Sequence, residues 1–364
     1  MKSTNYKFEK LLNPTILLIL CSLACQQFTY AQNVLTVDNR PESGAQYDNV
    51  QDAIAAASSG DIIYIHPSPT SYGSITLDKT LTLVGPGHDP SNSEGLRATL
   101  GAITLDANTL NTEIRGLNIS SISAYSNGTN AANVHIINNR ITTSVRGYYF
   151  AGSTNNWVIE GNYFDDSYSS IVIYCANMSD LQIRNNIILG RITDPNRTTI
   201  VTNNLFIQED TTGDSMVFSN VGDITSPIVT NNMFVFTDPD ITALTNSGST
   251  PVTYTNCLTW KEAGGVALAA LSGSGNLDNT NPLFNNIPTT VSDFYNNDYT
   301  LGSGSPAIGV GTDGGEIGIF GRGFPFDIHG RPISMPYPTA MTILNTVVQP
   351  GQTLSVDFQA SQKN

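Results

Sequence analysis

The sequence contains little charge and few cysteines. Only 13% of its 364 residues are charged, with 16 Lys and Arg against 30 Asp and Glu, which gives a formal net charge of −14. Disordered chains are rich in charge and poor in apolar residues, whereas 40% of this chain is hydrophobic, so we expect it to fold. The shortage of basic residues excludes nonspecific binding to nucleic acid and disfavours attachment to an anionic membrane through a basic patch.

Long hydrophobic runs are also absent beyond the N-terminus, where a spanning helix would need roughly 18 apolar residues. Residues 1–31 have the pattern of a secretory signal peptide, with three early lysines, a short apolar run at Thr15–Ala24 and a T-Y-A cleavage site ending at Ala31. A lipoprotein cleaved before Cys25 is the alternative. We therefore expect a secreted, extracellular or cell-surface protein with no transmembrane segment in the mature chain.

Removal of the signal would leave two cysteines, Cys175 and Cys257. Their wide separation excludes a C-x-x-C metal or redox pair. A long-range disulfide is one interpretation in an oxidising compartment, and two buried small hydrophobes is the one that we favour. The four histidines are scattered without the spacing of a metal site.

Asparagine, in contrast, is abundant, with 37 copies, and much of it belongs to a repeat. The repeat reads apolar, variable, Asn or Gly, Asn, variable, apolar, and it recurs about every 23 residues, which is typical of a solenoid. Its seven copies begin at Ile114, Ile136, Ile159, Ile183, Val201, Val229 and Tyr254.

Each repeat is too short for a pair of helices, and short Val, Ile, Thr and Tyr runs with period-2 alternation flank the asparagines. This pattern predicts an all-β fold, a single-stranded right-handed parallel β-helix with one coil per repeat. Asparagine tolerates the left-handed turn conformation, and its amide can bond the equivalent asparagine one coil away. Such a ladder would satisfy polar groups that are otherwise buried without partners.

A solenoid needs covered ends, because an open terminal coil exposes sheet edges and core. At the N-terminal end, Asp48 and Gln51 predict a capping box for a short helix, with Gly60 as its C-terminal stop. At the other end, residues 260–271 interrupt the repeat. The expected closing elements are a resumed coil at Asn281–Phe284 and the segments Gly304–Gly309 and Gly315–Phe320.

Residues 47–87 (YDNVQDAIAAASSGDIIYIHPSPTSYGSITLDKTLTLVGPG) resemble the opening of the pectin-lyase-like superfamily of right-handed parallel β-helices. The later N-P-L-F, G-S-P-A-I-G and E-I-G-I-F-G segments resemble the ends of secreted bacterial β-helix-repeat proteins of the Bacteroidetes type. The resemblance covers roughly residues 33–330 and implies the fold. It implies no single function, because the superfamily includes lyases, hydrolases, esterases and adhesins.

The predicted organisation is a signal peptide at 1–31, the β-helix at 32–334, and a C-terminal β-hairpin or linker tail at 335–364. We expect the mature protein to be a monomer.

Outward side chains at equal register in a β-helix stack about 4.8 Å apart, so the repeat also predicts surface neighbours. Polar and aromatic groups gather on the second to fourth repeats and suggest a saccharide groove. Arg140 or Arg184 would hold a uronate carboxylate, and Asp165 would act as an acid or a calcium ligand. Tyr163 or Trp157 would stack on a sugar ring, although Trp157 has an inward register typical of the core. The candidate catalytic residues are Arg140, Asp165 and Arg184, and the candidate substrate-binding residues are His135, Glu160, Tyr163 and Asp166.

The alternative interpretation of these residues is a solvated face with Glu160 and Arg184 as an exposed cross-strand pair. The sequence contains only part of the catalytic motifs of the enzymes that the resemblance implies. A polygalacturonase-type Gly-His-Gly turn is absent, and a lyase would have to use arginine as its base, since no lysine lies in the patch. We therefore expect a protein that binds polysaccharide or cell-surface glycan, with possible calcium dependence. A polysaccharide lyase, before a hydrolase, and a purely structural or adhesive module are the alternatives.

Overall fold

The computed structural model describes residues 32–106, 108–124, 131–147, 154–165, 170–208, 215–222, 226–287, 291–332, 336–344, 349 and 351–361. The expected signal peptide, its cleavage site and Asp166 lie outside these residues. Within the described part of the chain, no helix is both long enough and apolar enough to cross a membrane.

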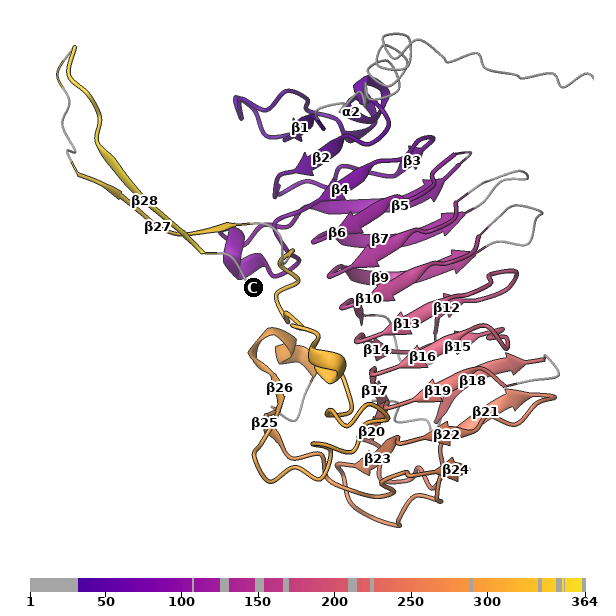
Figure 1. Cartoon of the computed structure of the whole chain (residues 1–364). Helices are drawn as coiled ribbons and strands as arrows, with labels where there is room; N and C mark the ends of the chain where they lie inside the picture. Colours follow the sequence, from indigo (N-terminus) through magenta and orange to yellow (C-terminus); the bar gives the residue numbers. More distant parts are fainter. Residues whose placement is uncertain are drawn as a thin grey trace, which may run out of the picture. The chain divides into compact units, whose positions relative to one another are not determined.

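Two large sheets of parallel strands make up most of the described chain (Figure 1). The first sheet has eleven strands, all paired in parallel. In spatial order they are β1 (Val34–Val37), β2 (Ile62–Ile65), β4 (Thr82–Val84), β6 (Glu113–Arg115), β8 (His135–Ile137), β10 (Val158–Glu160), β13 (Gln182–Arg184), β16 (Ile200–Thr202), β19 (Ile228–Thr230), β22 (Tyr254–Thr255) and β24 (Gly273–Ser274).

The second sheet has thirteen strands and alternates with the first along the chain. Its strands are β3 (Ile75–Leu77), β5 (Thr99–Leu105), β7 (Asn118–Ala124), β9 (Arg140–Gly147), β11 (Tyr163–Asp165), β12 (Ile171–Tyr174), β14 (Ile187–Leu189), β15 (Arg191–Thr193), β17 (Leu205–Gln208), β18 (Met216–Val221), β20 (Met233–Phe236), β21 (Thr245–Gly248) and β23 (Leu258–Lys261).

This alternation stacks the coils into a parallel β-solenoid, as the repeat predicted. Equivalent apolar residues of successive repeats pair in register, for example Ile136 with Ile159 and Ile159 with Ile183. These side chains are fully buried and belong to one continuous core that fills the interior of the coils. The predicted all-β, parallel-coil architecture is therefore confirmed.

The N-terminal end of the stack is covered by helix α2 (Val50–Ala56), which buries Val50, Ala53 and Ile54 against the first strands. Asp48 is not its N-cap. Asn49 takes that position and accepts hydrogen bonds from the backbone N–H groups of Gln51 and Asp52. The helix also ends before Gly60, with Ala57 as C-cap. The capping-box prediction was thus one residue out of place, because Asp48 and Asn49 are both suitable caps and the backbone geometry selects the second.

The second asparagine of each pair points into the solenoid and forms the predicted ladder. The backbone N–H groups of Asn139, Asn162, Asn186 and Asn204 each donate to the side-chain oxygen of the next asparagine, at 2.9–3.0 Å. The side-chain amide of Asn186 in turn donates to the Ile159 carbonyl at 2.8 Å. The ladder prediction is confirmed, and each rung satisfies backbone groups of two neighbouring coils.

Cys257 occupies an asparagine position in this ladder. Its Sγ accepts the backbone N–H of Asn232 at 3.4 Å, and its own N–H donates to the Asn276 side chain at 3.0 Å. Burial raises the pKa of the Cys257 thiol to about 12. Cys175 and Cys257 are both free and buried, as we expected of small core residues.

The first residue of each pair lies at positive φ and faces outward. Five of these asparagines bind residues of one later segment, which therefore runs along the stack in the reverse order of the coils. The side-chain amides donate from Asn256 to the Val310 carbonyl (2.5 Å), from Asn231 to Thr312 Oγ1 (3.0 Å), from Asn203 to the Glu316 carbonyl (3.5 Å), from Asn185 to the Ile319 and Gly321 carbonyls (both 3.0 Å), and from Asn138 to the Arg331 carbonyl (3.0 Å).

We name residues 282–287 and 291–332 the cover segment. It contains β25 (Phe284–Asn286), the 3₁₀ helix η2 (Val291–Asn296), β26 (Asp298–Leu301) and the 3₁₀ helix η3 (Gly321–Gly323). β25 pairs antiparallel with β26, so the coil pattern does not resume at Asn281–Phe284 as expected. The expected closing residues lie beside the coils, where Gly318 donates its backbone N–H to the Asn231 carbonyl at 2.9 Å.

A second hydrophobic cluster lies between the cover segment and the outer face of the second sheet. The solenoid contributes outward side chains of β11, β14, β17, β20 and β23. The cover segment contributes Phe294, Tyr299, Ala307, Ile317, Ile319 and Phe326. These strands of the second sheet are consequently apolar on both faces, and the cover segment shields their outer face from water.

Two further elements lie outside the coils. The 3₁₀ helix η1 (Pro90–Ser93) follows the N-cap Asp89. Strands β27 (Tyr337–Ile343) and β28 (Val356–Ser361) pair antiparallel, and every side chain of β28 is exposed.

Replacement of Asn186 by Ala tests the ladder. The change removes the acceptor of the Asn162 N–H and the donor to the Ile159 carbonyl, so buried groups lose their partners. We expect the free energy of unfolding to fall by about 3 kcal/mol, measured by urea denaturation. Asn286→Ala, at an exposed position of β25, is the matched control and should change it by less than about 0.5 kcal/mol. Equal effects of the two changes would contradict a structural role for the ladder.

Replacement of Gly330 by Ala tests the attachment of the cover segment. Gly330 lies at φ +66°, and a Cβ there would meet the His88 ring at 2.0 Å. Gly323 has φ +67° with open space around it, so Gly323→Ala carries the same backbone strain without the clash. We expect Gly330→Ala to be less stable than Gly323→Ala by about 1–3 kcal/mol and to exchange amide hydrogens faster in residues 317–332. Indistinguishable variants would show that this contact does not hold the segment.

Candidate functional site

Three candidate residues form one hydrogen-bonded cluster on the outer face of the first sheet, which we name the first-sheet cluster. Glu160 lies opposite Arg184 in the register of β10 and β13. Its Oε1 contacts His135 Nε2 at 2.7 Å, and its Oε2 accepts from Arg184 Nε at 2.5 Å. The pairing of Glu160 with Arg184 is confirmed, but Glu160 is only 7% exposed rather than solvated.

Opposing effects act on the Glu160 carboxyl. Burial alone would raise its pKa, but the hydrogen bonds from His135 and Arg184 outweigh burial and hold the pKa below its usual 4.5. Glu160 is therefore a carboxylate at neutral pH. Arg184 is held from its other side by Gln182, whose Oε1 accepts from the guanidinium at 3.0 Å. The cluster thus has fixed side-chain orientations while 34% of His135 and 30% of Arg184 remain exposed.

Three other candidates, Arg140, Tyr163 and Asp165, form a separate cluster on the second sheet. Arg140 Nε donates to Asp165 Oδ2 at 2.8 Å, and one of its terminal nitrogens donates to Asn118 Oδ1 at 2.8 Å. The Tyr163 hydroxyl donates to Asp165 Oδ1 at 3.0 Å. Because β10 precedes the Asn162 turn and β11 follows it, the turn places this cluster and the first-sheet cluster on different sheets.

Tyr163 and Trp157 both lie inside the structure rather than on an open groove. Phe294 of the cover segment stacks on Tyr163 with ring centroids 3.6 Å apart and 6° between the planes. Burial raises the pKa of the Tyr163 hydroxyl above its usual value. Trp157 is fully buried, and its indole N–H bonds the Ala131 carbonyl. In this arrangement neither ring has a free face for a sugar, which for Tyr163 departs from the expected role.

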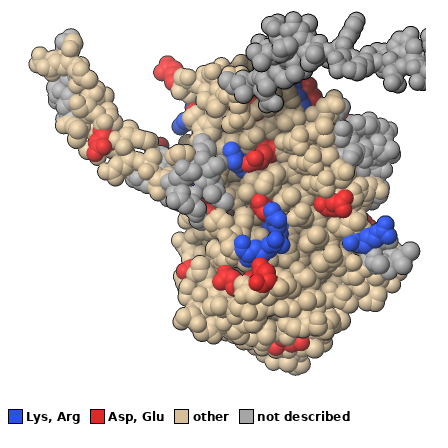
Figure 2. All heavy atoms as spheres, viewed as in Figure 1, with Lys and Arg blue, Asp and Glu red and all other residues tan. Residues whose placement is uncertain are grey.

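Charged groups are few, and several of them form ion pairs, among them Arg115 with Glu113, Arg140 with Asp165 and Arg184 with Glu160. Figure 2 shows that Lys and Arg atoms on the face drawn mostly lie beside Asp or Glu atoms. Among the residues that the structure describes, no group of three or more His, Cys, Asp or Glu side chains could hold a metal ion. Calcium binding therefore remains a prediction.

Neither the cover segment nor the apolar face beneath it was predicted from the sequence. A signal was present in the repeats, because the three-residue strand Ile187–Leu189 is apolar at every position, as are the first three residues of β17 and β20. Strands that are apolar at every position are buried on both faces. The residues following the asparagine pairs thus predict a covering layer, although they do not identify which residues form it.

Comparison with known proteins gives no match, either to a protein-family model or to a curated protein.

Replacement of Glu160 by Gln tests the first-sheet cluster through its pH dependence. A carboxyl whose pKa is lowered by folding stabilises the folded state above its unfolded pKa, and this contribution is lost as the pH falls through the folded value. We expect Glu160→Gln to be about 1 kcal/mol less stable than the parent at pH 7, measured by urea denaturation. The difference in stability between Glu160→Gln and the parent should narrow as the pH falls below 4.5, the usual pKa of a Glu side chain.

The matched control is Glu113→Gln on the same sheet. Glu113 also pairs with an arginine, Arg115 at 2.9 Å, but 31% of its side chain is exposed, so its pair is screened by water. The inference that Glu160 is ionised at neutral pH would be contradicted by a loss of stability in Glu160→Gln that does not depend on pH. A loss no larger than that in Glu113→Gln would also contradict it.

Proposed function

We propose that this protein is a secreted or cell-surface glycan-binding β-solenoid that holds an acidic polysaccharide along the outer face of its first sheet. The observation that carries the proposal is the fixed orientation of the Arg184 guanidinium between Glu160 and Gln182. A planar guanidinium in a fixed position is suited to a uronate carboxylate, which it can bind through two parallel hydrogen bonds.

The register extends this site along the solenoid. Arg115, Ile137, Glu160 and Arg184 occupy one row on adjacent strands. Adjacent strands are about 4.8 Å apart, which is comparable with the length of one pyranose unit in an extended polysaccharide. Arg115 and Arg184, three strands apart, could therefore contact carboxylates of sugars three units apart on one chain.

Two features of the sequence support an extracellular role. Residues 1–31 have the pattern of a secretory signal, and residues 47–87 resemble the opening of the pectin-lyase-like superfamily, to which we propose that the chain belongs. In this proposal the mature protein acts as a monomer outside the cell or on its surface.

A polysaccharide lyase or hydrolase is the second candidate. The observation that favours it is the contact of His135 with Glu160, since a histidine oriented by a carboxylate is a common arrangement of a general base. Binding without turnover is the better-supported function, because Arg140 and Arg184 are each engaged by a carboxylate, and the two clusters lie on different sheets.

The test is a calorimetric titration of the purified protein with oligogalacturonate, with and without calcium. We expect Arg184→Ala to weaken binding about tenfold, since hydrogen bonds between charged groups are worth about 1.5–3 kcal/mol. Arg184→Lys should restore binding only partly, because lysine lacks the planar guanidinium that donates two parallel hydrogen bonds. Arg197→Ala, at an exposed arginine outside the cluster, is the matched control and should bind as the parent does.

The same mixtures are followed at 235 nm for unsaturated products and by reducing ends. Binding that depends on Arg184 without product supports the proposed function. Product formation that is abolished by His135→Ala would instead establish the enzyme, and Arg140→Ala and Asp165→Ala would test the second cluster. No binding to any acidic glycan would contradict the proposal and leave a structural or adhesive module.

A further inference from the structure

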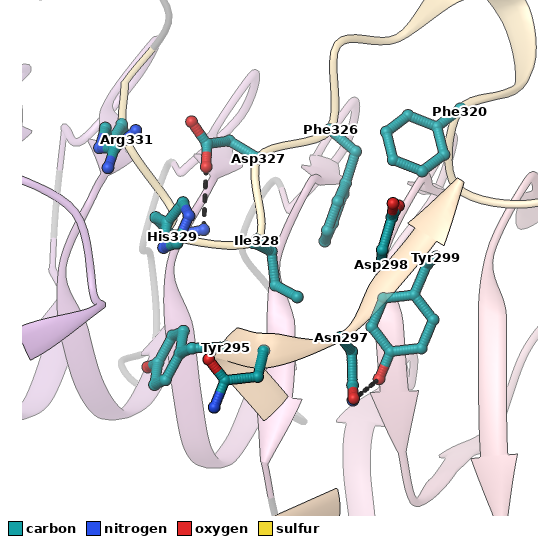
Figure 3. Close-up of a pocket in the computed structure, with 11 residues that line it drawn as sticks. Tyr295, Asn297, Asp298, Tyr299, Phe320, Phe326, Asp327, Ile328, His329 and Arg331 are labelled. Carbon is teal, nitrogen blue, oxygen red and sulfur yellow. Dashed lines mark hydrogen bonds between the residues drawn. The ribbon is translucent and has the colours of Figure 1, made fainter. Parts of the chain in front are cut away.

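The cover segment contains a pocket of about 480 Å³ that belongs to neither of the clusters described above. This volume is within the range of about 300–1,000 Å³ that is usual for small-molecule sites. Figure 3 shows its lining side chains coming from two parts of the segment, residues 295–299 and residues 320–331. The pocket therefore exists only because the cover segment folds back on itself against the solenoid.

Aromatic rings form the walls of the pocket. Tyr295 and Phe320 are half-buried, whereas Tyr299 and Phe326 are almost fully buried in the cluster beneath the cover segment. Tyr295 is fixed through its hydroxyl, which donates to the His88 carbonyl at 2.9 Å. Rings that are held in place in this way provide preformed apolar surface for a flat ligand at little cost in conformational entropy.

The polar groups of the pocket include the buried amide of Asn297 and the exposed carboxylate of Asp298. Asn297 is 7% exposed, and its Oδ1 accepts no hydrogen bond from a described residue, while its amide nitrogen donates to the Tyr299 hydroxyl at 2.8 Å. Asp298 is exposed, and the contacts of its Oδ1 are to Thr300, at 3.0 Å to the backbone nitrogen. The Asn297 oxygen is buried beneath the pocket surface, so the acceptor that the pocket offers to a ligand is the exposed carboxylate of Asp298.

The balance of charge in the pocket favours a ligand that donates hydrogen bonds and carries positive charge. Asp298 and Asp327 contribute two carboxylates, and Arg331 contributes one cation. His329 also lines the pocket, but its Nδ1 contacts the Asp89 carboxylate at 2.5 Å. The chain as a whole carries a formal charge of −14, which also attracts cations.

We propose that this pocket is a second saccharide site and that it binds an amino sugar unit with a free amine. The carbon face of the pyranose ring would lie on Tyr295 or Phe320, and the ammonium would bind the exposed carboxylate of Asp298. This ligand has the opposite charge to the acidic glycan proposed for the first-sheet cluster. The two sites can therefore be tested independently, on the same protein.

The experiment compares deacetylated chitotriose, which carries amines, with cellotriose, which has hydroxyls in their place, by calorimetry at 150 mM salt. We expect the amino trimer to bind about tenfold more tightly. Asp298→Asn should remove this preference, whereas Asp357→Asn, at an exposed aspartate of β28, should not. Phe320→Ala should weaken binding of both trimers, whereas Phe358→Ala, at a phenylalanine of β28 that is 61% exposed, should weaken neither.

Each outcome decides the proposal. A preference for the amine that is lost only in Asp298→Asn, with general weakening only in Phe320→Ala, supports it. Equal binding of the two trimers overturns the assignment to an amino sugar. Absence of binding overturns the proposal that this pocket binds an amino sugar. Equal loss of amine binding in Asp298→Asn and Asp357→Asn also overturns it, because it would show that the amino trimer is attracted by the net charge alone. Titration of the same variants with oligogalacturonate reports separately on the first-sheet cluster.

Discussion

The asparagine pair at the turn is the interaction on which the rest of the structure depends. Each coil must change direction where its backbone groups are shut off from water, and the inner asparagine supplies both the donor and the acceptor that those groups need. The outer residue takes the left-handed conformation that the turn requires and presents its own amide to the cover segment. One dipeptide therefore determines how the coils stack and where the covering layer attaches.

The sequence predicts the solenoid well because its evidence is local and repeated. Each pair of asparagines needs only its counterpart in the adjacent coil, so the register of one repeat applies to the next. The cover segment has no such repetition. Asn185 and Ile319 are 134 residues apart, and nothing in either neighbourhood indicates the other. The apolar strand Ile187–Leu189 shows that a cover is needed without showing what provides it.

The difference between repeated local contacts and long-range contacts also explains how much of the candidate site could be predicted. Glu160 and Arg184 are neighbours because of the register alone, so their contact could be predicted from the repeat. The environment of Tyr163 could not be predicted, because it depends on Phe294, which belongs to the cover segment. Register thus identifies which outward side chains meet, whereas long-range packing decides which of them remain open to a ligand.

The antiparallel course of the cover segment has a consequence for the order of folding. Near its end the cover segment joins His329 to Asp89, 240 residues earlier in the chain, so the covering of the first coils cannot be completed until residue 329 has been made. Pairings at such separation form slowly, because a long loop must be closed before they contribute. The coils can stack earlier, with the apolar face of β14, β17 and β20 open to water. That partly folded stack is the species most prone to aggregation, and docking of the cover segment, from Asn256 towards Asn138, ends its exposure.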